Sequence, residues 1–285
     1  MAQLTAYLTI TRPINVIIGI FSIFVGALIT GTLEPLAKVL LACLSGGVIA
    51  GAANAINDYY DLEIDRINKP NRPLPAGKLT PTGVFNFSVI FFGVGIVLGA
   101  LVNLQAFFIA LFSSGLLFLY SARLKRTVLW GNLSVSLVTG LAFIYGGVAV
   151  NRFYASLIPA GFSFFFHLGR EIIKDTQDVE GDAANQVVTF PIQYGKKPAL
   201  IAATAVYLFL IVLTLLPYFY QIYGFYYLIV VLLGVDGVVV AILFSIWCDS
   251  SAKNLGRMSN LLKADMLVGL VAIFLGRTTN SSFPF

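Results

Sequence analysis

Acidic residues are few in this chain, and most of them fall in two short clusters. Of the 13 Asp and Glu residues, nine lie within residues 58–65 or 171–182. In each cluster three aspartates recur with the spacing i, i+3, i+7, which places them on one face of a helix. These two aspartate stripes are Asp58, Asp61 and Asp65 in the first cluster, and Asp175, Asp178 and Asp182 in the second.

Carboxylates at this spacing repel one another and need a compensating positive charge. Carboxylate and amide oxygens favour hard cations, and Mg²⁺ commonly bridges one or two carboxylates to a substrate phosphate. Basic side chains lie directly downstream of the first cluster and on the link after residues 105–121, so the pattern predicts a divalent-cation site for a diphosphate. A solvated acidic turn would explain one cluster but not two matched ones. The basic side chains are Arg66, Lys69, Arg72, Lys125 and Arg126.

The residues around these stripes are those of a membrane protein. Hydrophobic residues make up 58% of the 285 and charged residues 11%, against roughly 25% charged in soluble domains. In hydrocarbon, backbone N–H and C=O groups must be hydrogen-bonded within helices or within a closed barrel of strands. The apolar runs lack the period-2 alternation of barrel strands, so they are expected to be helices. We therefore expect an all-α, polytopic bundle of nine transmembrane helices, with one domain over residues 1–277 and a tail at 278–285. The nine apolar runs are 13–32, 36–56, 82–102, 105–121, 129–150, 153–173, 198–218, 222–247 and 260–276.

Proline and the basic residues give starts and orientation to these runs. Pro13 and Pro81 should open helices and Pro35 should precede one, because a missing N–H costs least there. With the N-terminus and the links after even-numbered runs on one side, that side holds 15 of the 18 Lys and Arg residues. The positive-inside rule makes that side cytoplasmic and leaves the C-terminus outside. We expect no cleavable signal and no nucleic-acid partner.

Two further features of the apolar runs bear on chemistry. Cys43 and Cys248 have no second Cys or His at ligand spacing, which favours packing over a disulfide or zinc role. Asp236 lies in the middle of a run, where an unpaired charge is costly, so this carboxyl must be protonated, partnered or cavity-facing. The lone His167 is expected to be a hydrogen-bonded residue inside the bundle.

Taken together, these motifs resemble those of the UbiA superfamily of intramembrane prenyltransferases. Asn57-Asp58-x-x-Asp61-x-x-x-Asp65 is similar to the first family motif, and Asp178-x-x-x-Asp182 with Asp175 ahead of it is similar to the second. Further agreement comes from residues 71–77 (NRPLPAG), from 120–125 (YSARLK) and from Arg12-Pro13-x-Asn15. The resemblance covers all nine runs.

The resemblance implies a nine-helix bundle in which Mg²⁺ holds the diphosphate of a prenyl donor. An allylic carbocation would form in a water-poor pocket, shielded by the ring of Tyr120. Implied metal ligands are Asn57, Asp61, Asp65, Asp178 and Asp182, assisted by Asp58 and Asp175. Implied catalytic residues are Asp61, Asp65, Asp178, Asp182, Tyr120 and Lys125, and implied substrate-binding residues are Arg12, Asn15, Arg66, Lys69, Arg72 and Arg123.

The acceptor is the open part of this expectation. Within the superfamily the chain is most similar to members that join a geranylgeranyl group to geranylgeranylglyceryl phosphate, which makes an ether bond of archaeal membrane lipids. Aromatic acceptors of quinone biosynthesis, such as 4-hydroxybenzoate, homogentisate or a naphthoate, are the alternative with the same chemistry. An ion-coupled transporter is the alternative outside enzymology, but its acids would be expected at mid-depth of the membrane.

Overall fold

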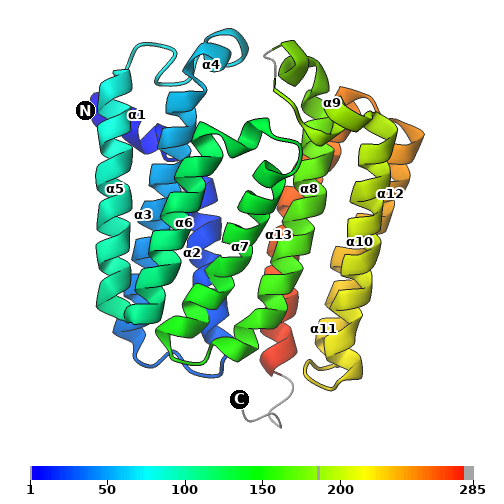
Figure 1. Cartoon of the computed structure of the whole chain (residues 1–285). Helices are drawn as coiled ribbons and strands as arrows, with labels where there is room; N and C mark the ends of the chain where they lie inside the picture. Colours follow the sequence, from blue (N-terminus) through cyan, green and yellow to red (C-terminus); the bar gives the residue numbers. More distant parts are fainter. Residues whose placement is uncertain (1, 185–186, 279–285) are drawn as a thin grey trace. The chain divides into compact units, whose positions relative to one another are not determined.

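The computed structural model describes residues 2–184 and 187–278, and these residues form helices and turns without a strand (Figure 1). The chain divides into two compact units, and each is described by itself. Unit 1 comprises residues 1–125 and 141–156, and unit 2 comprises residues 126–140 and 157–285.

Unit 1 is built on the long, apolar helix α3. Helix α3 packs against α2, α5 and α6, and its small residues Ala42, Ala52 and Ala55 are fully buried at these contacts. The second half of α7 completes the unit, and Gly146 there approaches the backbone of α2 closely. The helices of unit 1 are α1 (Ala2–Ile10), α2 (Pro13–Leu28), α3 (Leu36–Tyr60), α4 (Leu62–Asn68), α5 (Pro81–Val102), α6 (Leu104–Ala122), residues 141–149 of α7 (Trp130–Ala149) and η2 (Phe153–Ser156). The short η1 (Leu124–Arg126) lies at the boundary between the units.

Unit 2 is centred on α8, which contacts α10 and α13. Its core is formed by buried side chains such as Ile173, Tyr207 and Ile246. The span that begins with α11 does not stay α-helical, because a six-residue π-helical segment, η3, separates α11 from α12. The helices of unit 2 are residues 130–140 of α7, α8 (Leu157–Ala184), α9 (Phe190–Tyr194), α10 (Lys196–Phe219), α11 (Phe225–Val230), η3 (Val231–Asp236), α12 (Gly237–Cys248) and α13 (Ala252–Thr278).

The helix starts predicted from proline are confirmed. Pro13 and Pro81 are the first residues of α2 and α5, and Pro35 is the N-cap of α3. The Thr80 side chain caps α5 by accepting a hydrogen bond from the Gly83 N–H, which satisfies one of the free donors of the first turn.

The count of nine membrane spans is not confirmed. Among the described residues seven helices are long and apolar enough to cross a membrane, or eight if α1 and α2 form one span bent by 51°. Helix α2 alone has only 16 residues because the chain bends at Arg12. The run at 153–173 falls on α8, which continues to residue 184 through the charged second stripe and is not among the seven.

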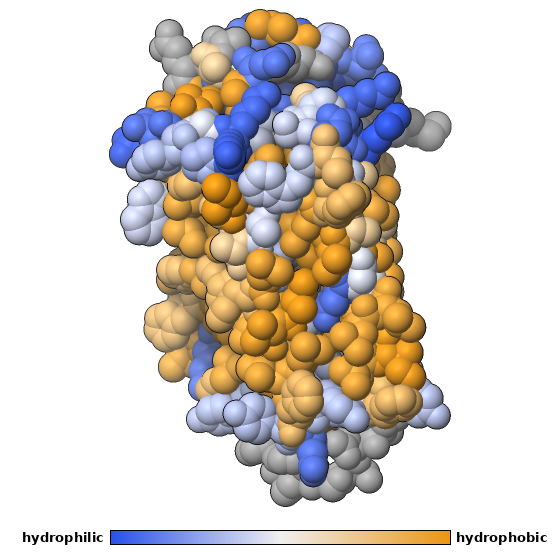
Figure 2. All heavy atoms as spheres, turned by 90° about the vertical axis from the view of Figure 1, so that its right-hand side faces the viewer, coloured by the Kyte–Doolittle hydropathy of each residue, from blue (hydrophilic) through white to orange (hydrophobic). Residues whose placement is uncertain are grey.

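The outer surface of these helices is that of a multi-pass membrane protein. Figure 2 shows apolar side chains across the middle of one face, with hydrophilic residues gathered at both of its ends. Large apolar side chains such as Val212, Leu233 and Phe244 are exposed on these helices. The inside–outside orientation and the single domain over residues 1–277 stay predictions. Most of the proposed tail, residues 279–285, lies outside the described residues.

Candidate active site

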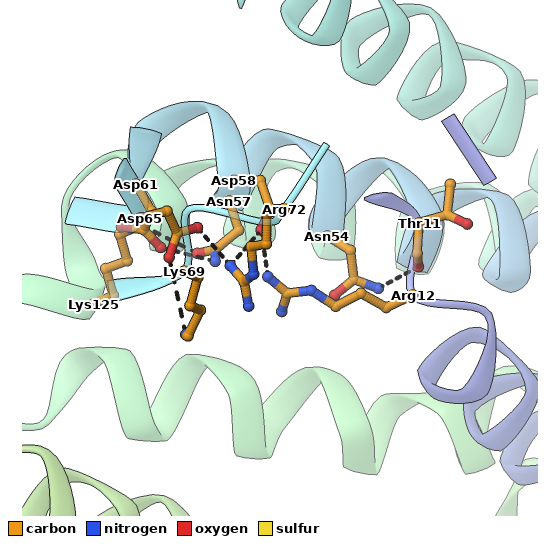
Figure 3. A network of polar contacts seen from close by, with 10 residues as sticks. All are labelled: Thr11, Arg12, Asn54, Asn57, Asp58, Asp61, Asp65, Lys69, Arg72 and Lys125. Atoms are coloured by element: carbon orange, nitrogen blue, oxygen red, sulfur yellow. Dashed lines mark hydrogen bonds and ion pairs between the residues drawn. The ribbon is translucent and has the colours of Figure 1, made fainter. Parts of the chain in front are cut away.

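The first aspartate stripe spans the junction between α3 and α4, with Asp58 on α3, Asp61 at the junction and Asp65 on α4. The helix is interrupted at Asp61, whose backbone lies at φ −95° and ψ 5°. The helical hydrogen-bond pattern nevertheless continues, from Asp61 N to Asn57 O at 3.0 Å and from Asp65 N to Asp61 O at 2.8 Å. The predicted placement on one side of the chain is therefore retained, and these side chains meet in one polar network (Figure 3).

Asp58 lies at the buried end of this network. Its side chain is 3% exposed and accepts hydrogen bonds from two guanidinium groups, those of Arg12 and Arg72. The Arg72 Nη1 to Asp58 Oδ1 distance is 3.0 Å. A buried carboxylate with two cationic donors is compensated by the chain itself.

Arg72 also binds Asp65, the last acid of the stripe. Its Nη1 lies 2.6 Å from Asp65 Oδ2, so one guanidinium group bridges Asp58 and Asp65. Lys69 is a weaker partner, with its Nζ 4.0 Å from Asp65 Oδ1. Arg72 belongs to the segment after α4, and this bridge fixes that segment against α3 and α4.

Asp61 and Asn57 face a different cation. Lys125 Nζ lies 2.6 Å from Asp61 Oδ1 and 3.2 Å from Asn57 Oδ1, and Asn57 Nδ2 donates to Asp61 Oδ2 at 3.0 Å. The Lys125 side chain is 12% exposed. An ammonium group thus sits between one carboxylate oxygen and one amide oxygen.

The backbone at Arg12 is held in an unusual conformation. Arg12 is the N-cap of α2 with φ 53° and ψ 72°, in the left-handed region that side chains other than glycine rarely adopt. The amide of Asn54, on α3, donates to Thr11 O at 2.8 Å, next to the bend. Together with the Arg12–Asp58 ion pair, this contact fixes the bend against α3.

Arg66, Arg123, Tyr120 and Asn15 are further residues implied by the resemblance. Arg66 pairs with Glu63, at 2.8 Å on the exposed face of α4. Arg123 is exposed after α6, whereas Tyr120 and Asn15 are half-buried on α6 and α2.

In unit 2 the second aspartate stripe lies on the unbroken helix α8. Asn132, on α7, donates to Asp175 Oδ2 at 2.8 Å. Burial raises the pKa of Asp175 to about 7, although this hydrogen bond opposes the shift. Asp178 is half-buried one turn further along α8, and the backbone carbonyl of Asp182 accepts from Val187 N at 3.0 Å.

Asn132 is a site residue that sequence reasoning missed. The only sequence feature that could have identified Asn132 is a polar amide in the first turn of an apolar helix, directly after a basic link. His167 is a hydrogen-bonded residue of α8, as expected, since its Nδ1 lies 2.9 Å from Ser163 O.

The oxygen atoms of unit 1 fit a hard divalent cation by their chemistry. Carboxylates and one amide oxygen are the ligands that Mg²⁺ accepts. The Lys125 ammonium group, which contacts Asn57 Oδ1 and Asp61 Oδ1, marks where this oxygen set already stabilises a positive charge. Among the described residues, three or more His, Cys, Asp or Glu side chains do not converge at metal-binding geometry.

Comparison with known proteins agrees with these motifs. The model of the UbiA prenyltransferase family matches residues 19–261. The digeranylgeranylglyceryl phosphate synthase of Methanopyrus kandleri is 39% identical over 267 residues, covering 94% of this chain and 97% of that protein.

Solved structures show the same fold. A structure described as a digeranylgeranylglyceryl phosphate synthase in membranes is 34% identical, covers 97% of this chain and 99% of that one, and gives a TM-score of 0.82. A UbiA homologue from Archaeoglobus fulgidus bound to GPP and Mg²⁺ is 19% identical with a TM-score of 0.69, over 94% of this chain and 99% of that one. At that identity the second likeness concerns the fold alone.

Proposed function

The chain belongs to the UbiA prenyltransferase family, and from this premise we propose that it transfers a geranylgeranyl group from its diphosphate to geranylgeranylglyceryl phosphate. The observation that carries the acceptor is the full-length similarity to digeranylgeranylglyceryl phosphate synthases, at 39% identity to one protein and 34% to a solved structure. The product would be the second ether bond of an archaeal membrane lipid.

The reaction exchanges one C–O bond for another. The allylic C–O bond of the donor breaks, and its electron pair leaves with diphosphate. The acceptor hydroxyl oxygen then bonds to the allylic carbon and releases its proton, which leaves an ether. The barrier lies mainly in separating charge, so groups that stabilise the departing diphosphate supply most of the catalysis.

Residues of unit 1 are suited to bind that diphosphate. Arg12 and Arg72 present guanidinium groups whose positions are fixed by Asp58, and both side chains keep a quarter to a third of their surface exposed. Guanidinium groups bind phosphate through paired N–H donors. Lys69, Arg66, Arg123 and Asn15 are further substrate-binding residues in this proposal, and Lys125 serves as a cation close to Asp61.

The aspartate stripes are proposed to hold Mg²⁺. When bound, Mg²⁺ neutralises the charge that develops on the leaving diphosphate. The supporting observation is the chemistry of the oxygen donors beside Lys125. The proposed ligands are Asn57, Asp61, Asp65, Asp178 and Asp182, with Asp58 and Asp175 assisting. Tyr120 is proposed to shield the allylic cation with its ring, and the bundle to keep water away from it.

The alternatives are an aromatic acceptor and an ion-coupled transporter. Family membership argues against a transporter, and nine of the 13 acidic residues fall in the two motif clusters. An aromatic acceptor is less well supported, because the chain is similar over nearly its full length to proteins named digeranylgeranylglyceryl phosphate synthase.

Purified protein should release diphosphate from geranylgeranyl diphosphate when geranylgeranylglyceryl phosphate and Mg²⁺ are present. Mass spectrometry should then detect a lipid with two ether-linked geranylgeranyl chains. Prenylation of 4-hydroxybenzoate in place of the lipid would retain prenyl transfer and overturn the acceptor. Absence of turnover with every acceptor would contradict the proposed function.

A further inference from the structure

A second group of acidic side chains lies inside unit 2, away from both aspartate stripes in the sequence. Asp236 ends the π-helical segment η3, and Asp265 lies near the middle of α13, an element that packs against η3. Each residue is at most 4% exposed. Both belong to helices long and apolar enough to span a membrane, so these carboxyl groups lie within candidate membrane spans.

The two carboxyl groups differ in how their oxygens are satisfied. Both oxygens of Asp236 lie within hydrogen-bond distance of Thr214 Oγ1, at 3.2 and 3.1 Å. Neither oxygen of Asp265 has a hydrogen-bond partner, although both are buried. Asp265 interacts electrostatically with Asp236, and the elements that carry them, α13 and η3, pack against each other. A buried carboxylate without a donor or a cation costs several kcal/mol.

The surroundings supply polar oxygen atoms but no ion pair. The Thr214 carbonyl accepts from the Tyr227 hydroxyl at 2.6 Å, so further oxygens lie next to Asp236. The ion pairs found among the described residues do not include Asp236 or Asp265. Arg170 and Glu171, on α8 of the same unit, bind each other. The buried Asp265 carboxyl therefore needs a bound cation or a proton.

We propose that Asp236 and Asp265, with the Thr214 hydroxyl, form a binding site for one monovalent cation of the Na⁺ type inside unit 2. Carboxylate and hydroxyl oxygens are suitable ligands for a hard cation. The few oxygens gathered here suit an ion of single charge, whereas a divalent ion would need six or more oxygens. The π-helical segment supports this assignment, because such distortions of a helix are frequent at functional sites.

The bound ion would stabilise the folded protein without taking part in prenyl transfer. A ligand that binds only the folded state raises its stability in proportion to the logarithm of ligand concentration. We expect the midpoint of thermal unfolding in detergent to rise by about 3 °C or more when choline chloride is replaced by NaCl at constant ionic strength. A chelator present throughout removes divalent ions from the aspartate stripes.

Variants locate the effect. Asp265→Asn should abolish the difference between NaCl and choline chloride, whereas Asp249→Asn, which changes an exposed acid in the link before α13, should retain it. If Asp265→Asn does not fold, binding of radioactive Na⁺ to the unaltered protein gives an independent readout, with about one ion expected per chain.

Equal midpoints in NaCl and choline chloride would overturn the proposal. A midpoint that depends on pH but not on the cation would also overturn it, since a shared proton would then neutralise the pair. Retention of the Na⁺ effect in Asp265→Asn would overturn the location.

Discussion

At the scale of single residues, the first aspartate stripe separates into two kinds of carboxylate. Asp58 is buried and binds two arginines, whereas Asp61 is 21% exposed and lies beside Lys125. The sequence predicted that these acids share a face and have basic partners. It could not predict which base binds which acid, because Lys125 is 64 residues from Asp61 and Arg12 is 46 residues from Asp58.

Asp61→Ala should reduce prenyl transfer by at least about 100-fold, because it removes a proposed ligand oxygen from the site where charge would develop. The protein should still fold and insert into the membrane. Glu63→Ala is the matched control, since Glu63 lies two residues away, is 78% exposed along its side chain and pairs only with Arg66 among the ion pairs described. Rates and thermal midpoints of both variants provide the test. Full activity of Asp61→Ala would exclude Asp61 from the metal site.

Asp58→Asn should act through the arginines that Asp58 holds. We expect the free energy of unfolding to fall by about 1–3 kcal/mol, because two guanidinium groups lose a buried charged partner. The KM for the diphosphate donor should rise more than kcat falls. Denaturation curves and steady-state kinetics measure both effects. A lower kcat with unchanged stability and unchanged KM would instead make Asp58 a direct metal ligand.

At the scale of helices, hydropathy located most spans but not their interruptions. Hydropathy does not mark the three interruptions, which are the bend at Arg12, the break at Asp61 and the π-helical turn before Gly237. The sequence there is either uniformly apolar or rich in the polar residues of the motifs. Each interruption is fixed by contacts with a different helix, such as Arg12 with Asp58 or Asp236 with Thr214. Such long-range contacts cannot be predicted from local sequence patterns.

Gly146→Ala tests the close approach of α7 to α2 in unit 1. A Cβ atom at Gly146 would lie 1.8 Å from the backbone oxygen of Ile23, so the helices would have to move apart. We expect a loss of about 1–3 kcal/mol in stability. Gly19→Ala, on α2 itself, is the control, because its added Cβ would meet no atom within 4 Å beyond the adjoining residues and backbone of its own helix. Equal thermal midpoints for the two variants would contradict the close contact.

At the scale of the whole molecule, the distribution of basic residues predicts the orientation in the membrane. The link after α12 should be cytoplasmic and the link before α3 should be outside. Cys248, the last residue of α12, is exposed, whereas Cys43 is buried. The native Cys248 thiol can therefore report which side of the membrane holds the link after α12. A membrane-impermeant maleimide should label Cys248 in inside-out vesicles but not in intact cells. In a Cys248→Ser background, Glu34→Cys should show the reverse pattern, and the same pattern for both sites would contradict the orientation.

The charges of the network in unit 1 have a consequence for the order in which ligands bind. Three carboxylates and four cationic side chains give this network a formal charge of +1. A free divalent cation is therefore repelled, while a diphosphate is attracted. We expect the donor to enter first or already complexed with Mg²⁺. Calorimetric titration with Mg²⁺ should give tight binding only when an unreactive diphosphate analogue is present, so the enzyme would recognise the magnesium diphosphate complex as its true substrate. The side chains concerned are Asp58, Asp61, Asp65, Arg12, Lys69, Arg72 and Lys125.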